Sequence, residues 1–374
     1  MSTLHELKAR GQSVWLDHID HDLIHSGELK KWVDEDEICG VTPNPGILAS
    51  EEMRAFLGGG HTPATASEKV VIADIQAAAD ILRPVYEKTH RREGYVSLQV
   101  SPALADDTEK AVAEARRLWH EVGRENLLIE IPATESGLPA ITQLIADGIN
   151  VNATLLFSQA LYQRAAQAYL DGLEQLIARG GVARAAQAYQ EGMGKRRARG
   201  GNPANGASVE SLFLSRIDTA VDAIITSLLN QCGWIKIYNA VERESLRNLL
   251  GKVAIANARV AYERYQAIFS GARWDALAAQ GARKQRLLWA STAIENPAYR
   301  DVKYIEELIG PDTVTTIPPV TLALFRDHGR VRDSLQENTA NSAILLSTLK
   351  TLRIPLDDIA SRLLSEGSKP FTTV

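Results

Sequence analysis

Short apolar segments that alternate with longer helical patterns constrain the fold of this chain most strongly. Most of the eight segments are four to eight residues long, apolar on both faces, and followed by polar, proline or glycine turns. Such strands belong to a parallel sheet covered by helices, because neither face meets water. Helical patterns lie between them, for example at 108–122 and 138–147. The sequence therefore predicts an α/β fold, a closed (β/α)8 barrel of the TIM type with extra helices. The eight segments are 13–19, 38–43, 94–101, 127–133, 151–157, 208–215, 287–292 and 313–318.

Length and composition agree with one globular enzyme. A chain of 374 residues fits a single barrel domain over 1–374, with a C-terminal helical segment at 330–374. The net charge of −5 argues against a nucleic-acid partner, because no excess of Lys and Arg neutralises phosphates. We expect no membrane span and no signal peptide, since no apolar run approaches 18 residues and the N-terminus is polar. Two cysteines without a Cys-x-x-Cys pair are typical of a reduced, cytoplasmic enzyme.

A tandem duplication follows the fifth apolar segment. The sequence Arg-Ala-Ala-Gln-Ala-Tyr occurs at 164–169 and again at 184–189. Two copies are too few for a solenoid. The second copy has lost its apolar stripe and leads into a glycine-rich stretch, so we predict a duplicated helical insertion near 182–206. We favour a tolerated surface insertion over a loop that overhangs an active site.

Several motifs occur in order along the whole chain, and together they resemble the transaldolase family, particularly its longer bacterial branch. The resemblance implies a (β/α)8 barrel that acts on phosphorylated sugars. Any one motif would be a weak signal, whereas the ordered set is a strong one. The motifs include Ser-Val-Trp-Leu-Asp-His-Ile at 13–19, Gly-Val-Thr-Pro-Asn-Pro at 40–45, Leu-Leu-Ile-Glu-Ile-Pro-Ala-Thr at 127–134, Gly-Ile-Asn-Val-Asn-Ala-Thr at 148–154 and Ser-Leu-Phe-Leu-Ser-Arg at 211–216.

The resemblance also implies roles for individual residues at the carboxyl ends of the strands, where barrel active sites form. Asp17 would be a general acid/base, and Thr154 would help to position a catalytic water. An arginine fork matches phosphate oxygens, which suits the phosphate-binding role of Arg216. Asn44 would hydrogen-bond sugar hydroxyls, and Ser211 and Arg216 would hold the phosphate. The substrate-binding residues predicted are Asn44, Asn152, Ser211, Phe213 and Arg216.

Two positions depart from the family pattern. Transaldolases carry a lysine in the fourth strand that forms a Schiff base with the sugar carbonyl, and this chain has Glu130 there. Gln99 stands where the family has a glutamate that pairs with the proton-relaying water. A carboxylate cannot form an imine, and two facing carboxylates would repel each other. We therefore interpret Gln99 as a coupled change that removes this conflict and donates a hydrogen bond to Glu130.

The sequence thus predicts a transaldolase-like enzyme without a Schiff base. Asp17 and Glu130 would form an acid/base pair for lyase, isomerase or cyclase chemistry on a phosphorylated substrate, most simply a sugar phosphate. One alternative is a cyclase or lyase acting on a diphosphate ester such as a prenyl diphosphate, with Mg²⁺ held by Asp17 and Glu130. The others are a non-catalytic phospho-ligand binder and an inactivated transaldolase. No other cofactor is expected, and a homodimer is compatible with the fold.

A second group of polar residues follows the first strand. His21 and His25 are four residues apart and would share one face of a helix. They could hold a metal ion, but the resembling family has polar residues there without one. We therefore do not predict a metal site from the sequence.

Overall fold

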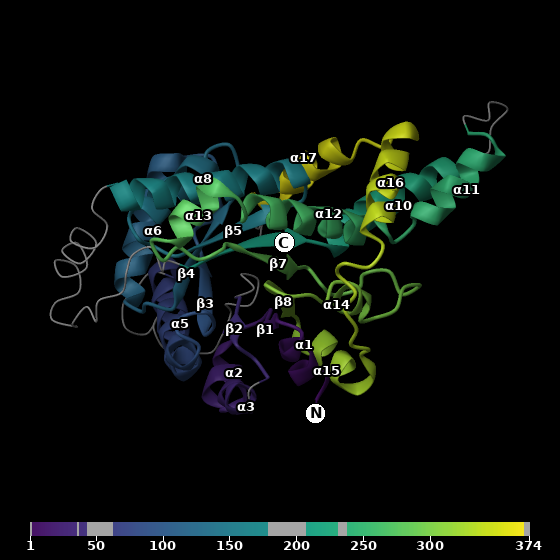
Figure 1. The fold of residues 1–374 in the computed structure, drawn as a ribbon. Helices are drawn as coiled ribbons and strands as arrows, with labels where there is room; N and C mark the ends of the chain where they lie inside the picture. The colour runs from purple at the N-terminus through teal and green to yellow at the C-terminus, as the bar shows by residue number, and fades with distance from the viewer. Residues whose placement is uncertain (1, 36, 43–62, 179–206, 231–237, 370–374) are drawn as a thin grey trace.

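The computed structural model describes residues 2–35, 37–42, 63–178, 207–230 and 238–369. Eight strands form a closed barrel in the order β1 to β8, and every neighbouring pair is parallel, so the predicted (β/α)8 fold is confirmed (Figure 1). Each strand overlaps one predicted apolar segment. The strands are β1 (Gln12–Leu16), β2 (Gly40–Val41), β3 (Tyr95–Gln99), β4 (Leu127–Pro132), β5 (Val151–Leu156), β6 (Ser208–Phe213), β7 (Arg286–Ala290) and β8 (Thr313–Ile317).

Helices connect the strands and surround the barrel (Figure 1). The patterns at 108–122 and 138–147 become α6 and α7, the second shifted by one residue. The insertion at 182–206 lies outside the described residues. No described helix is long and apolar enough to cross a membrane. The α-helices are α1 (Thr3–Ala9), α2 (His21–His25), α3 (Glu28–Asp34), α5 (Pro63–Lys88), α6 (Thr108–Val122), α7 (Gly137–Ala146), α8 (Gln159–Ala178), α10 (Ser215–Asn230), α11 (Ala240–Leu249), α12 (Val253–Ile268), α13 (Ala272–Ala278), α14 (Lys303–Glu306), α15 (Pro319–His328), α16 (Thr339–Thr351) and α17 (Leu356–Gly367).

Helix α6 shows how the local sequence sets an element and its buried face. The Asp107 carboxylate accepts a hydrogen bond from the backbone N–H of Lys110, which satisfies a free donor at the helix start. Gly123 ends the helix at φ 59°, a conformation that costs glycine little. The apolar side chains repeat at helical spacing and bury one face against the barrel. That face comprises Ala111, Val112, Ala115, Leu118 and Val122.

A large aromatic side chain fills part of the barrel beside β2. Trp15 on β1 is fully buried. A Cβ atom on Gly40 of β2 would lie only 2.4 Å from the Trp15 ring. Any larger residue at position 40 would therefore displace the indole, so the two positions are matched in size.

The amino-terminal end of the barrel is closed by a buried ion pair. Arg286 at the start of β7 donates from Nη1 to Glu93 Oε1 at 2.8 Å and to Ser13 Oγ at 2.6 Å. Ser13 Oγ in turn donates to Glu93 Oε1 at 2.5 Å. Arg286 and Glu93 are each 8% exposed, so each charge depends on the other for solvation. The cluster links β1 and β7 to Glu93, two residues before β3.

Replacing Arg286 by Met should lower the free energy of unfolding by about 3–5 kcal/mol, because it removes the buried cation that pairs with the Glu93 carboxylate. Urea unfolding followed by circular dichroism measures this change. Arg247→Met is the matched control, since Arg247 pairs with Glu244 at the surface and should contribute less than about 1 kcal/mol. Equal losses in the two variants would contradict the role of the buried pair.

Candidate active site

Strand register brings the predicted catalytic residues to one face of three adjacent strands. The Cα atoms of Gln99 on β3 and Glu130 on β4 are register partners, and Glu130 is the register partner of Asn152 on β5. Side chains at matched positions of parallel strands point to the same side of a sheet. Glu130 is 7% exposed and Asn152 is fully buried. A carboxyl group therefore lies among the buried polar side chains of β3 to β6.

A chain of hydrogen bonds crosses four strands and fixes this carboxyl group. Ser211 Oγ on β6 donates to Asn152 Oδ1 at 2.7 Å. Asn152 Nδ2 donates to Glu130 Oε1 at 3.1 Å and to Ser97 Oγ on β3 at 3.2 Å. The amide of Asn152 thus satisfies both of its ends and sets the orientation of Glu130.

Burial shifts the acidity of both carboxyl groups. Desolvation, followed by the negative charge of Asp17, raises the pKa of Glu130 from an ordinary 4.5 to about 8, against hydrogen bonds from Ser97 and Asn152 that lower it. Desolvation also raises the pKa of Asp17, while a hydrogen bond from Thr42 and the charges of His18 and Arg216 oppose the rise. Thr42 Oγ1 donates to Asp17 Oδ1 at 3.1 Å. Two carboxyl groups that sense each other therefore share the site.

The expected hydrogen bond from Gln99 to Glu130 is a correction to the sequence analysis. Among the described residues, the side chains that hydrogen-bond Glu130 are Asn152 and Ser97. Gln99 is the last residue of β3 and is only partly buried, so its longer side chain lies at the rim. Sequence reasoning missed Ser97, although it stands two residues before Gln99 and therefore on the same face of the strand.

Thr154 lies two residues beyond Asn152 on β5 and is 4% exposed. The strand is irregular directly after it, because the register to β6 shifts between Ala153 and Leu156. Leu155 has φ 61°, a left-handed conformation that is rare for a branched side chain. Bulges of this kind re-aim side chains near active sites. The structure thus places Thr154 at the point where β5 changes direction, and its role with water stays a prediction.

The residues predicted to hold phosphate are separated in the structure. Ser211 is 3% exposed, and its hydroxyl is engaged with Asn152. Arg216 is exposed in the first turn of α10, where its guanidinium carbon lies 5.5 Å from the centre of the Phe213 ring. The Phe213 ring also packs against Phe157, with centroids 5.3 Å apart. Of the two, only Arg216 is placed to meet an anion that arrives from solvent.

Glu295 adds a carboxylate to the same turn of α10. Its Oε1 accepts from Ser215 Oγ at 3.1 Å, and its Oε2 accepts from Thr219 Oγ1 at 2.8 Å. The start of a helix attracts negative charge, which suits this contact. A phosphate bound by Arg216 would share the turn with Glu295. The only signal in the sequence for the contact between Glu295 and α10 is that position 295 lies close to a family motif.

Two other features complete the account of the site. Asn44 lies outside the described residues, so its predicted contact with the sugar stays a prediction.

A cavity of about 440 Å³ is lined by residues that include Arg91, Arg283, Lys284 and Arg286. Arg286 begins β7, so this cavity lies at the opposite end of the barrel from the carboxyl ends of the strands. We therefore do not assign it to the reaction.

The comparison with known proteins agrees with the barrel fold. Residues 14–373 match the family described as Transaldolase/Fructose-6-phosphate aldolase. The chain belongs to this transaldolase family. It is 44% identical to "Transaldolase 2" of Nostoc punctiforme, over 99% of this chain and 94% of that protein. It is 40% identical to "Transaldolase" of Trichodesmium erythraeum and to "Transaldolase" of Saccharopolyspora erythraea, each over 99% of this chain and 94% of the relative.

The raised pKa of Glu130 predicts a pH-dependent difference in stability between the protein and its Glu130→Gln variant. A carboxyl group whose pKa is higher in the folded state contributes its full stability below about pH 4.5, and this is lost as pH rises through about 8. The amide does not titrate. In thermal melts from pH 5 to 9, the melting temperature of Glu130→Gln relative to that of the parent should rise by a few degrees as pH rises.

The exposed Glu244 supplies the control for these melts, because its side chain is 62% exposed. The curve of melting temperature against pH for Glu244→Gln should be parallel to that of the parent over the whole pH range. A Glu130→Gln curve that is also parallel to the parent would show that Glu130 ionises at its ordinary pH in the folded protein.

Proposed function

We propose that this transaldolase-family protein is an enzyme that acts on a phosphorylated sugar by acid/base chemistry without a Schiff base. Glu130 is the acid and Asp17 is the base. The observation that carries the proposal is a buried carboxyl group, held by Asn152, at the position where the family resemblance places the imine-forming lysine. An amine at this position would attack a carbonyl, whereas a carboxyl group can only transfer a proton, form an ester or bind a cation.

The distribution of lysines supports the loss of imine chemistry. None of the eight described strands contains a lysine. Lys252, between α11 and α12, is exposed. Lys303 is engaged in a hydrogen bond to Asp218 Oδ2 at 3.1 Å and in a contact with the backbone oxygen of Gly251. Within the described residues, no lysine on a strand is therefore available to replace the one that the resemblance leads us to expect.

The environment of Glu130 supports its assignment as the acid. With a pKa of about 8, the carboxyl group is mostly protonated at neutral pH. Asn152 Nδ2 donates to Oε1, so this oxygen acts as an acceptor in the arrangement. A protonated carboxyl group can donate to a carbonyl or leaving-group oxygen of the substrate, while an ionised Asp17 removes a proton from carbon or oxygen. One proton is taken up and one is delivered, so the site remains balanced in charge.

Arg216 supports a phosphorylated substrate. It is exposed at the start of α10 and faces solvent beside Phe213, and its positive charge reaches Asp17. A guanidinium group in the first turn of a helix combines two preferences for anions. Thr154, Gln99 and Asn44 complete the proposed contacts with the sugar and its water. No cofactor is needed for proton transfer, although Mg²⁺ bound by Asp17 and Glu130 would suit a diphosphate ester.

Turnover should be sought with a panel of sugar phosphates and, in parallel, prenyl diphosphates, each with and without Mg²⁺, and read by mass spectrometry. We expect a sugar phosphate to be converted without Mg²⁺. Glu130→Gln and Asp17→Asn should each lower kcat by about 100-fold or more, because each removes one proton-transfer group. Activity should also fall as pH rises above about 8, where Glu130 loses its proton.

Glu210→Gln is the matched control for this experiment. Glu210 is a fully buried carboxyl group on β6, next to Ser211 in sequence and therefore on the opposite face of the strand. Its removal should leave kcat unchanged within about twofold. Turnover that survives both Glu130→Gln and Asp17→Asn would refute the acid/base pair. Binding without turnover would indicate a phospho-ligand binder, and Mg²⁺-dependent turnover of prenyl diphosphates would indicate the diphosphate chemistry.

The variant Glu130→Lys tests whether this site is a transaldolase with one inactivating change. We expect it to form little imine, because the hydrogen bonds of Asn152 and Ser97 are arranged around a carboxyl group. Borohydride reduction in the presence of fructose 6-phosphate, followed by intact mass measurement, detects an imine. Full labelling and dihydroxyacetone transfer by Glu130→Lys alone would support an inactivated transaldolase instead. The double variant Glu130→Lys/Gln99→Glu is measured beside it, to test whether imine formation requires both changes.

A further inference from the structure

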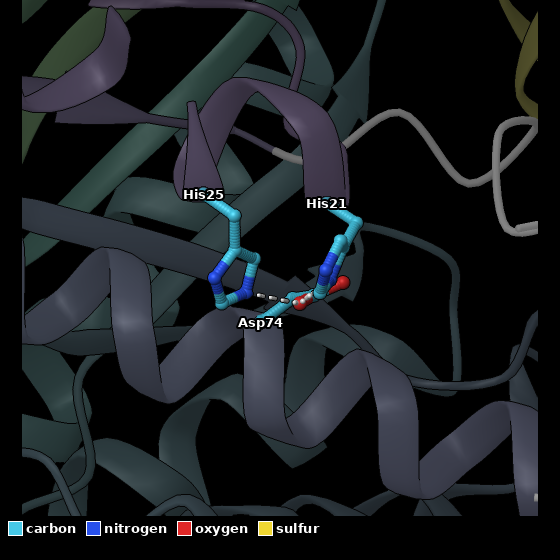
Figure 2. Close-up of side chains that lie close together, drawn as sticks. All are labelled: His21, His25 and Asp74. Atoms are coloured by element: carbon cyan, nitrogen blue, oxygen red, sulfur yellow. Dashed lines mark hydrogen bonds and ion pairs between the residues drawn. The ribbon is translucent and has the colours of Figure 1, made fainter. Parts of the chain in front are cut away.

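Two helices outside the barrel bring three metal-binding side chains together. His21 and His25 are the first and last residues of α2, and Asp74 lies on α5, about fifty residues away in the chain. Figure 2 shows both imidazole rings directed from α2 toward the Asp74 carboxylate. His21 Nδ1 lies 3.1 Å and His25 Nε2 lies 3.9 Å from Asp74 Oδ1. Of the residues that the structure describes, only these form a group of three possible ligands within 4.8 Å of one another.

These distances match the spacing of ligands around a tetrahedral ion. Zinc binds histidine nitrogen and carboxylate oxygen at about 2.0–2.2 Å, so neighbouring ligands in a tetrahedron are separated by about 3.3–3.5 Å. The observed separations of 3.1 and 3.9 Å bracket that value. Small side-chain rotations would therefore suffice, with no movement of α2 or α5.

The three residues differ in burial in a way that suits a metal site. Asp74 is 7% exposed, and its Oδ1 lies near a nitrogen of each imidazole. The side chain of His25 is 55% exposed, so the cluster can be reached from solvent. The imidazole rings are already stacked, with centroids 3.8 Å apart, so little ordering remains to be done on binding.

The helix that carries the histidines is itself held in place. Asp20 caps α2 by accepting from the backbone N–H of Leu23 at 2.7 Å, and His18 Nε2 lies 2.7 Å from the other oxygen of Asp20. Leu23 and Ile24 are buried in the core. The position of the two imidazoles is therefore set by packing and capping before any ion binds.

We propose that His21, His25 and Asp74 bind one divalent transition-metal ion, with Zn²⁺ as the best match. Two imidazoles and one carboxylate favour Zn²⁺ over Mg²⁺, which prefers an all-oxygen shell. The ion would connect two helices. One is α2, which follows β1 and Asp17 in the chain, and the other is the long helix α5. Its role is structural, and it is independent of the reaction proposed above, because none of its ligands is a residue assigned to that reaction.

Cobalt provides a direct test on the full-length protein after treatment with a chelator. We expect one equivalent of Co²⁺ to bind with the visible absorption of a four-coordinate ion, and Zn²⁺ but not Mg²⁺ to displace it. His21→Ala, His25→Ala and Asp74→Asn should each weaken the affinity by about tenfold or more, because one of three protein ligands is lost.

His328→Ala is the matched control. His328 contacts two carboxylates, at 2.9 Å from Asp301 and 3.1 Å from Asp327, but has no second histidine in that cluster. This variant should bind Co²⁺ as the parent does. His25→Gln guards against misfolding, because it keeps a polar side chain at a largely exposed position, and its melting temperature without metal should equal that of the parent.

Co²⁺ absorption that persists in the double variant His21→Ala/His25→Ala, or that is lost equally in His328→Ala, would overturn the proposal and indicate an adventitious ion only. Zn²⁺ should raise the melting temperature of the parent and not that of His25→Ala. Turnover in the His25→Ala variant reports separately on the proposed reaction, so failure of one proposal leaves the other open to its own test.

Discussion

The hydrogen bond between Asn152 and Glu130 is the interaction around which the candidate site is organised. It joins two neighbouring strands inside a barrel where water cannot solvate a charge. The carboxyl group is therefore held in one orientation and kept mostly neutral, with its pKa near 8. Ser97 and Ser211 extend the same network across four strands. A polar network that is fully satisfied in this way specifies one arrangement of its members, since each alternative leaves a buried group unpaired.

This network bears directly on the proposed reaction. An amine in the fourth strand would be a nucleophile, whereas the carboxyl group found there is buried, and the negative charge of Asp17 adds to the rise of its pKa. Arg216 beside Phe213 supplies an exposed positive charge, which the proposed phosphorylated substrate would need.

The two ends of the barrel use buried charges differently. At the amino-terminal end, Arg286, Glu93 and Ser13 form a closed set in which each charge is paired. At the carboxyl ends of the strands, Glu130 and Asp17 are like charges that cannot both ionise easily. The first arrangement favours stability. The second costs stability at high pH, and such a cost is common where a site performs chemistry.

The sequence by itself determined the barrel, because eight strands buried on both faces must be apolar throughout and that pattern is local. It also predicted Glu130, Asp17 and Arg216 as site residues, since each stands in a recognisable motif, and their roles stay predictions. It could not identify the partner of Glu130, which was assigned to Gln99 and is Asn152, because register between strands sets which side chains meet. Nor could it bring Asp74 to His21 and His25. Only the packing of α2 against α5 does so, because residues about fifty positions apart become neighbours through tertiary contact alone.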